Sequence, residues 1–152
     1  MWEQLRRFSA LDGKARSIFV RAIFVLPLVA QSLRWRGFGA TQGSLRRRTA
    51  AAGKSLDPGN QNLELTVRMV KAAVRHSSGH PSCLEESLTL WWLLARQGIS
   101  SEVRIGVRKQ AQEFEAHAWV ERGGVALNEP TEKHRHYAAF ESEFPQAHPG
   151  TR

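Results

Sequence analysis

The chain has 152 residues, a length that fits one domain, and 41% of them are hydrophobic, which is enough to form a core. A single cysteine excludes an internal disulfide and is typical of a reduced, intracellular protein. The net charge of +8 indicates either an acidic partner, such as an acidic peptide, a nucleic acid or a membrane surface, or only a soluble protein with a basic N-terminal region.

Residues 1–37 have the pattern of apolar helices. The most apolar stretch, 18–30, is about 13 residues long and contains Arg21 and Pro27, so it falls short of the roughly 20 residues that cross a bilayer. It also lacks the cleavage site of a secretory signal. We therefore expect a buried or partner-facing helix, with contact to a membrane surface as the less favoured alternative.

The segment 38–60 is rich in glycine and polar residues and is predicted to be a loop. Its run Arg46–Arg48 is typical of a solvated surface, and binding of phosphate or an acidic peptide is the alternative. The later Gly-Lys-Ser at 53–55 is not a phosphate-binding loop, because Arg48 stands where the first glycine of that motif is required.

Two amphipathic helices are expected next. The first covers 63–74, with Leu65, Met69, Val70 and Ala73 on one face. Pro81 and Ser82 are helix-start residues and Gly98 is a natural stop, so the second helix begins at Cys83. Its core-facing stripe is Leu84, Leu88, Trp91, Leu94 and Ala95.

Strands follow the helices. Apolar residues alternate from 102 to 107, a second strand covers 114–121, and a third covers 125–128, joined to the second by a hairpin turn at 122–124. The aromatic tail from His134 is expected to pack over the sheet. The sequence thus predicts a single α+β domain over 1–152, with a helical N-terminal region and loop at 1–60 and a catalytic core at 61–152.

Cys83 and His117 are the candidate catalytic pair. A thiol in the first turn of a helix lies at the positive end of the helix dipole, which favours the nucleophilic thiolate. His117 lies in a strand about 34 residues later, where an imidazole could act as general base. A lone cysteine at a helix start is more often a small buried residue, and a lone strand histidine is more often structural. Spacing alone therefore does not show whether Cys83 and His117 are catalytic.

The third group of such a site should orient the imidazole from the neighbouring strand. A three-residue turn at 122–124 places Glu129 opposite His117, whereas a two-residue turn at 123–124 places Pro130 there, with Asn128 diagonal to it on the same face. Both alternatives stay open, and Glu129 is favoured because a carboxylate stabilises imidazolium better than an amide does.

A zinc site built from His76, His80, Cys83 and His117 is a weaker alternative. Glycine and proline flank His80, so the two histidines do not form a helical ligand pair. We expect no metal and no cofactor, and we place His134 and His136 in a surface loop. Glu85 and Glu86 interact favourably with the helix dipole, but their negative charges would oppose thiolate formation at Cys83 if they pointed at the sulfur.

The residues from 83 to 129 carry a resemblance to a known family. They contain C-L-E-E-S-L, then L-A-R-Q-G-I, I-G-V, A-H-A-W-V-E and L-N-E. This combination resembles the B protein of lasso-peptide biosynthesis, a transglutaminase-like leader peptidase. The resemblance implies a papain-like α+β core, with Cys83 as nucleophile and His117 as general base. Many members carry an acidic residue after the hairpin, where this chain has Asn128 and Glu129.

The implied reaction is removal of the leader from a ribosomally made precursor peptide in the cytoplasm. The chain resembles the stand-alone peptidase half of the family, so the implied partners are the precursor, a separate leader-recognition protein and an asparagine-synthetase-like lasso cyclase, with no nucleic acid. ATP, if the system requires it, is expected on the cyclase. A transglutaminase-like acyltransferase and a non-catalytic basic adaptor are the competing hypotheses.

Overall fold

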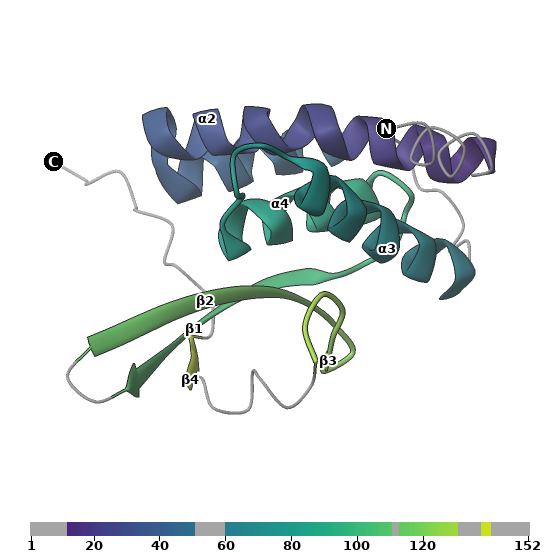
Figure 1. The fold of residues 1–152 in the computed structure, drawn as a ribbon. Helices are drawn as coiled ribbons and strands as arrows, with labels where there is room; N and C mark the ends of the chain where they lie inside the picture. The colour runs from purple at the N-terminus through teal and green to yellow at the C-terminus, as the bar shows by residue number, and fades with distance from the viewer. Residues whose placement is uncertain (1–11, 51–59, 111–112, 131–137, 141–152) are drawn as a thin grey trace, which may run out of the picture.

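A computed structural model describes residues 12–50, 60–110, 113–130 and 138–140. Its elements, labelled as in Figure 1, are α2 (Gly13–Ala50), α3 (Asn60–His76), α4 (Cys83–Ala95), β1 (Glu102–Gln110), β2 (Glu113–Arg122), β3 (Val125–Ala126) and β4 (Ala138–Phe140). The helices lie on one side of the sheet, and α4 packs between α2 and the strands (Figure 1). The predicted α+β class is confirmed.

The sheet is antiparallel, with the strand order β3-β2-β1-β4. β1 and β2 pair along their whole length, from Glu102 opposite Glu121 to Gln110 opposite Glu113. Side chains alternate between the two faces of a strand, so Val103, Ala118 and Val120 all point into the core under the helices. The sequence did not predict β4, which pairs with β1 on its other edge.

The largest correction concerns the segment 38–50, which is helical and not a loop. α2 continues through it after a sharp kink at Gly37, whose φ of 72° and ψ of 177° are not helical. The hydroxyl groups of Ser32 and Thr41 lie 2.8 Å apart across the kink. Nine residues of straight helix would separate them by about 13 Å, so the two arms of α2 fold back on each other. Phe38 and Leu45 bring the second arm into the core.

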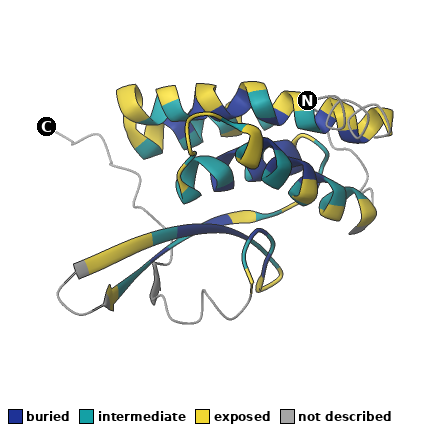
Figure 2. Ribbon diagram, viewed as in Figure 1, coloured by how far each residue is buried: buried dark blue, intermediate teal, exposed yellow. Residues whose placement is uncertain are grey.

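The core forms between the three helices and the sheet. α3 buries Met69, Val70 and Ala73, as its predicted face requires. α4 differs from a one-sided amphipathic helix, because Ser87, Leu88, Thr89 and Leu90 are all buried in succession (Figure 2). It lies in the middle layer, with α2 and α3 on one side and β2 on the other, so most of its circumference is covered.

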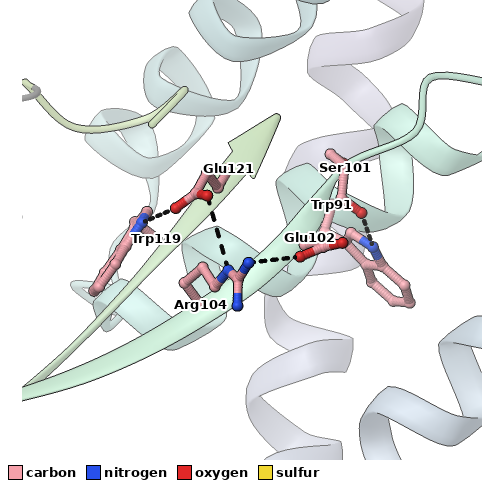
Figure 3. A network of polar contacts seen from close by, with 6 residues as sticks. All are labelled: Trp91, Ser101, Glu102, Arg104, Trp119 and Glu121. Carbon is pink, nitrogen blue, oxygen red and sulfur yellow. Dashed lines mark hydrogen bonds and ion pairs between the residues drawn. The ribbon is translucent and has the colours of Figure 1, made fainter. Parts of the chain in front are cut away.

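Polar contacts attach α4 to the start of β1 (Figure 3). The indole Nε1–H of Trp91 donates to the carbonyl oxygen of Ser101 at 3.1 Å. On the sheet, Arg104 bridges Glu102 and Glu121 at 3.1 and 3.9 Å. These contacts fix how the strands lie beneath the helix that begins at Cys83.

Several sequence predictions lie outside the described residues: the helix over 1–11, the rejected phosphate-binding loop at 53–55, and the surface positions of His134 and His136.

Candidate active site

Cys83 is the first residue of α4, and a capping box fixes that start. The Glu85 backbone N–H donates to Ser82 Oγ at 3.3 Å, and the Ser82 N–H donates to Glu85 Oε2 at 2.8 Å. This is the reciprocal arrangement that satisfies two backbone donors at a helix N-terminus. The thiol of Cys83 is free and only partly exposed. Glu85 is therefore engaged in capping and is turned back toward Ser82.

The side of α4 that carries Cys83 faces β2. Residues three and four positions apart share a helix face, so Cys83, Glu86 and Ser87 lie on one side. Ser87 Oγ donates to the carbonyl oxygen of Ala118 at 3.1 Å. Since Ala118 follows His117 directly in β2, this bond holds the first turns of α4 against the part of the strand that carries the histidine.

His117 lies near the middle of β2, with Gly106 opposite it on β1. Its ring is stacked on that of Trp119, with 6.3 Å between the ring centroids and 22° between the planes. Trp119 is itself anchored, because its Nε1–H donates to Glu121 Oε2 at 3.3 Å (Figure 3). A buried indole therefore supports one side of the imidazole and restricts its rotation.

The carboxylate of Glu129 contacts the imidazole. Glu129 Oε1 lies 3.3 Å from His117 Nε2, and the two side chains are 20% and 16% exposed. The two atoms are in close contact, without the alignment of a hydrogen bond. Of the two candidates for the third position, Glu129 is the one whose side chain meets the histidine.

Asn128 has a different position, inside the protein. It is 5% exposed. Its Oδ1 accepts the backbone N–H of Val120 at 2.8 Å, and its Nδ2 donates to Ser87 Oγ at 3.2 Å. The side chain thus joins β2, α4 and the segment after β3, and it fixes the backbone from which Glu129 projects.

The turn that underlies the Glu129 prediction is not the expected one. Arg122 pairs with Val125, so the turn has two residues, Gly123 and Gly124, with φ of 57° and 79°. These positive angles match a type I′ hairpin. The predicted three-residue turn is therefore wrong, and the register of the observed two-residue turn alone would have favoured Asn128.

Glu129 still reaches His117, because the strand pairing stops early. β3 ends at Ala126, and the N–H of Leu127 makes the next bond, to the carbonyl oxygen of Val120 at 2.8 Å. The side chain of Asn128 then takes the N–H of Val120 in place of a backbone carbonyl. The chain leaves the ladder at this point, so hairpin counting does not apply to Glu129.

Glu86 is a member of this cluster that the sequence did not identify. Burial raises the pKa of its carboxyl group above the ordinary 4.5, and the charge of Glu129 adds to the rise. A side-chain hydrogen bond with Asn128 and the charges of Lys71 and His117 oppose that rise in pKa. From its position in the first helical turn we expected an interaction with the helix dipole and, if the side chain pointed at the sulfur, opposition to thiolate formation. Nothing in the sequence showed that the carboxyl group is partly buried.

The histidine-rich segment before α4 does not assemble a metal site in the described part of the chain. A ring nitrogen of His76 is 2.8 Å from the carbonyl oxygen of Ala72 in its own helix. Within residues 12–50, 60–110, 113–130 and 138–140, no three His, Cys, Asp or Glu side chains are grouped to hold an ion.

Comparison with known proteins gives the family. A profile described as the transglutaminase-like superfamily matches residues 25–142. The chain therefore belongs to the transglutaminase-like superfamily, which includes cysteine peptidases and acyltransferases. Comparison with curated proteins and with solved structures gives no match.

Proposed function

We propose that this protein is a cysteine peptidase that removes the leader from a ribosomally made lasso precursor peptide. The observation that carries the proposal is the 3.3 Å contact between His117 and Glu129, on a strand held against the helix that begins at Cys83. Superfamily membership and the lasso-type motifs between residues 83 and 129 support the choice of reaction.

In the first step, Cys83 Sγ attacks the carbonyl carbon of the bond between leader and core, and its proton passes to His117 Nδ1. Glu129 holds the opposite ring nitrogen and stabilises the imidazolium. The oxyanion accepts a hydrogen bond from the backbone N–H of Cys83, which the helix itself cannot use.

The C–N bond then breaks, and His117 gives its proton to the amine of the core peptide. In the second step His117 takes a proton from water, whose oxygen attacks the thioester. The leader leaves with a new carboxylate, and the thiol of Cys83 is restored. No cofactor is required for this sequence of proton transfers.

The proposal includes the cellular setting. The peptidase works in the cytoplasm with a separate leader-recognition protein that presents the precursor. The freed amine is then available to an asparagine-synthetase-like cyclase, which would also be the site of any ATP use. The lasso-type motifs between residues 83 and 129 support these partners.

The test is mass spectrometry of a lasso-type precursor incubated with the protein and the leader-recognition protein. Wild type should make one cut at the leader–core junction. Cys83→Ala and His117→Ala should each slow it by about a thousandfold or more. His76→Ala is the matched histidine control, because His76 is exposed and bonds to its own helix, and it should cleave like wild type.

Two other outcomes would each indicate a different function. Cleavage of the leader from its core with capture by an added amine in preference to water would identify an acyltransferase with the same cysteine. Equal behaviour of wild type and Cys83→Ala would remove the thiol from the chemistry and leave a basic adaptor that binds its partner.

A further inference from the structure

The outer face of α2 carries exposed apolar side chains where a core helix would be polar. Phe24, Leu28 and Trp35 are 67%, 65% and 79% exposed, and Val20 is 40% exposed. Their spacing of four, four and seven residues places them in one stripe along the first arm of the helix. In Figure 2 the side of α2 that faces away from α3 and α4 is coloured mostly as exposed.

The opposite face of the same arm is packed into the protein. Ala15, Ala22 and Leu26 are each at most 2% exposed, in the core formed with α3 and α4. By length and composition alone, α2 would pass for a membrane-spanning helix. Because one face is committed to the core, only the other can meet lipid, so the helix can lie on a membrane but not cross it.

The charge of the protein is concentrated on this element. Between Gly13 and Ala50 there are eight Lys and Arg and no Asp or Glu, as many positive charges as the net +8 of the whole chain. At 100° per residue, Lys14 and Arg21 lie on one side of the apolar stripe, and Arg34 lies on the other. An apolar band of Phe, Leu and Trp between basic residues is complementary to an anionic bilayer surface.

A cavity opens beside the same stripe, between the two arms of α2. It has a volume of about 340 Å³, and its lining combines six apolar side chains with four uncharged polar ones and with Arg36 and Arg48. Leu28 and Trp35 belong both to this lining and to the exposed stripe. The apolar part of this lining, next to two guanidinium groups, suits an acyl chain below an anionic headgroup.

We propose that the outer face of α2 is a docking surface for an anionic phospholipid bilayer. The stripe enters the interface, and the flanking arginines contact the headgroups. The sheet lies on the far side of α4 from α2 (Figure 1), so the His117 strand faces away from the membrane. This inference does not depend on the proposed peptidase activity.

The test is co-sedimentation of the full chain with vesicles of phosphatidylcholine, with or without roughly 30 mol% phosphatidylglycerol. Binding should require phosphatidylglycerol and should weaken several-fold between about 0.1 and about 0.5 M salt. Phe24→Ser/Leu28→Ser should lower the partition coefficient by about tenfold or more, because it removes two apolar side chains from the interface. Phe114→Ser is the matched control, since Phe114 is 76% exposed but lies on β2.

Two further double variants separate the electrostatic attraction of α2 to the bilayer from the insertion of its apolar stripe. Arg21→Gln/Arg34→Gln should weaken binding by about thirtyfold, at about 1 kcal/mol for each of the two charges near the surface. Arg68→Gln/Arg75→Gln removes two exposed charges from α3 and should bind like wild type, as should Cys83→Ala. Equal binding with and without phosphatidylglycerol, or wild-type binding by Phe24→Ser/Leu28→Ser, would overturn the proposal. Failure of the wild type to sediment with any vesicle would also overturn it and would leave an acidic polypeptide as the partner of this face.

Discussion

At the scale of single residues, His117 interacts with two carboxyl groups that lie in different surroundings. Glu129 contacts the imidazole directly, at 3.3 Å. Glu86, on α4, interacts with His117 through its charge and is partly buried, and this burial raises its pKa. Because only Glu129 has a side-chain oxygen in direct contact with the ring, we infer that Glu129 is the carboxyl group that orients the imidazole.

Replacing Glu129 tests this assignment. Glu129→Gln keeps the size of the side chain but removes the charge that stabilises imidazolium. We expect the single-turnover rate of leader release to fall by about a hundredfold. Glu64→Gln, on the exposed side of α3, is the control for the loss of one carboxylate. An unchanged rate in Glu129→Gln would mean that another group orients the histidine.

Glu86 should make the stability of the fold depend on pH. Its raised pKa means that the native state binds the proton more tightly than the unfolded chain does. This favourable contribution is complete below the ordinary pKa of 4.5 and is lost as the pH rises from there through the raised value. Glu86→Gln removes the dependence and can still accept from Asn128. Urea unfolding should show that the stability of the variant relative to wild type increases from about pH 4 to about pH 7; a constant difference would contradict this.

The sequence could identify Cys83, His117 and Glu129 as candidates, because helix-start residues, strand alternation and a family resemblance all act locally. It could not identify the contacts of Asn128 and Glu86. Asn128 bonds to Ser87, 41 residues away, and no local pattern reports such a contact. Glu129 contacts His117 because the pairing of β3 with β2 ends early, and not because of the predicted three-residue turn.

At the scale of elements, the kink at Gly37 determines the shape of α2. With φ of 72° and ψ of 177°, this residue occupies backbone space that is open almost only to glycine. Gly37→Ala should therefore lower the free energy of unfolding by about 1–3 kcal/mol, although nothing lies within 4 Å of the added Cβ.

Gly39→Ala is the matched control two residues away. Gly39 is helical and also has open space around its Cβ position. Alanine is favoured over glycine in a helix, so this change should stabilise the protein by about 0.5–1 kcal/mol. Thermal or urea unfolding of both variants measures the difference, and equal effects would argue against strain at Gly37.

Elements with clear periodicity were predictable, and the rest were not. Strict alternation gave β1 and β2, and apolar spacing gave α3 and α4. The kink residue Gly37 is followed by two more glycines in the second arm of α2, Gly39 and Gly43. Such a glycine-rich segment is typical of a loop, so the helix there was not predicted. Its helix is stabilised by tertiary packing of Phe38 and Leu45, which outweighs the low helix propensity of glycine.

At the scale of the whole molecule, positive charge is not distributed evenly. The part of the chain outside α2 has 14 basic and 14 acidic residues, so it is balanced, while α2 carries the excess. Like charges such as Arg46–Arg48, all exposed, repel one another in the folded state. Salt screens this repulsion.

The melting temperature should therefore rise by a few degrees between about 0.02 and about 0.3 M salt. Arg46→Gln/Arg47→Gln/Arg48→Gln should show a smaller rise and a higher melting temperature at low salt. Scanning calorimetry measures both quantities. A melting temperature that falls as salt is added would show that attractive ion pairs dominate instead.

The contacts that build the candidate site enclose more chain than the contact across the kink of α2 does. Ser32 and Thr41 meet across nine residues, whereas Ser87 reaches Ala118 across 31 and Asn128 across 41. Closing a longer loop costs more chain entropy and slows folding. The two arms of α2 can thus pair early, whereas the contacts between α4 and β2 form only when the sheet has docked. In a nascent or partly unfolded chain Cys83 would be apart from His117, so the proposed peptidase activity would appear only in molecules that have finished folding.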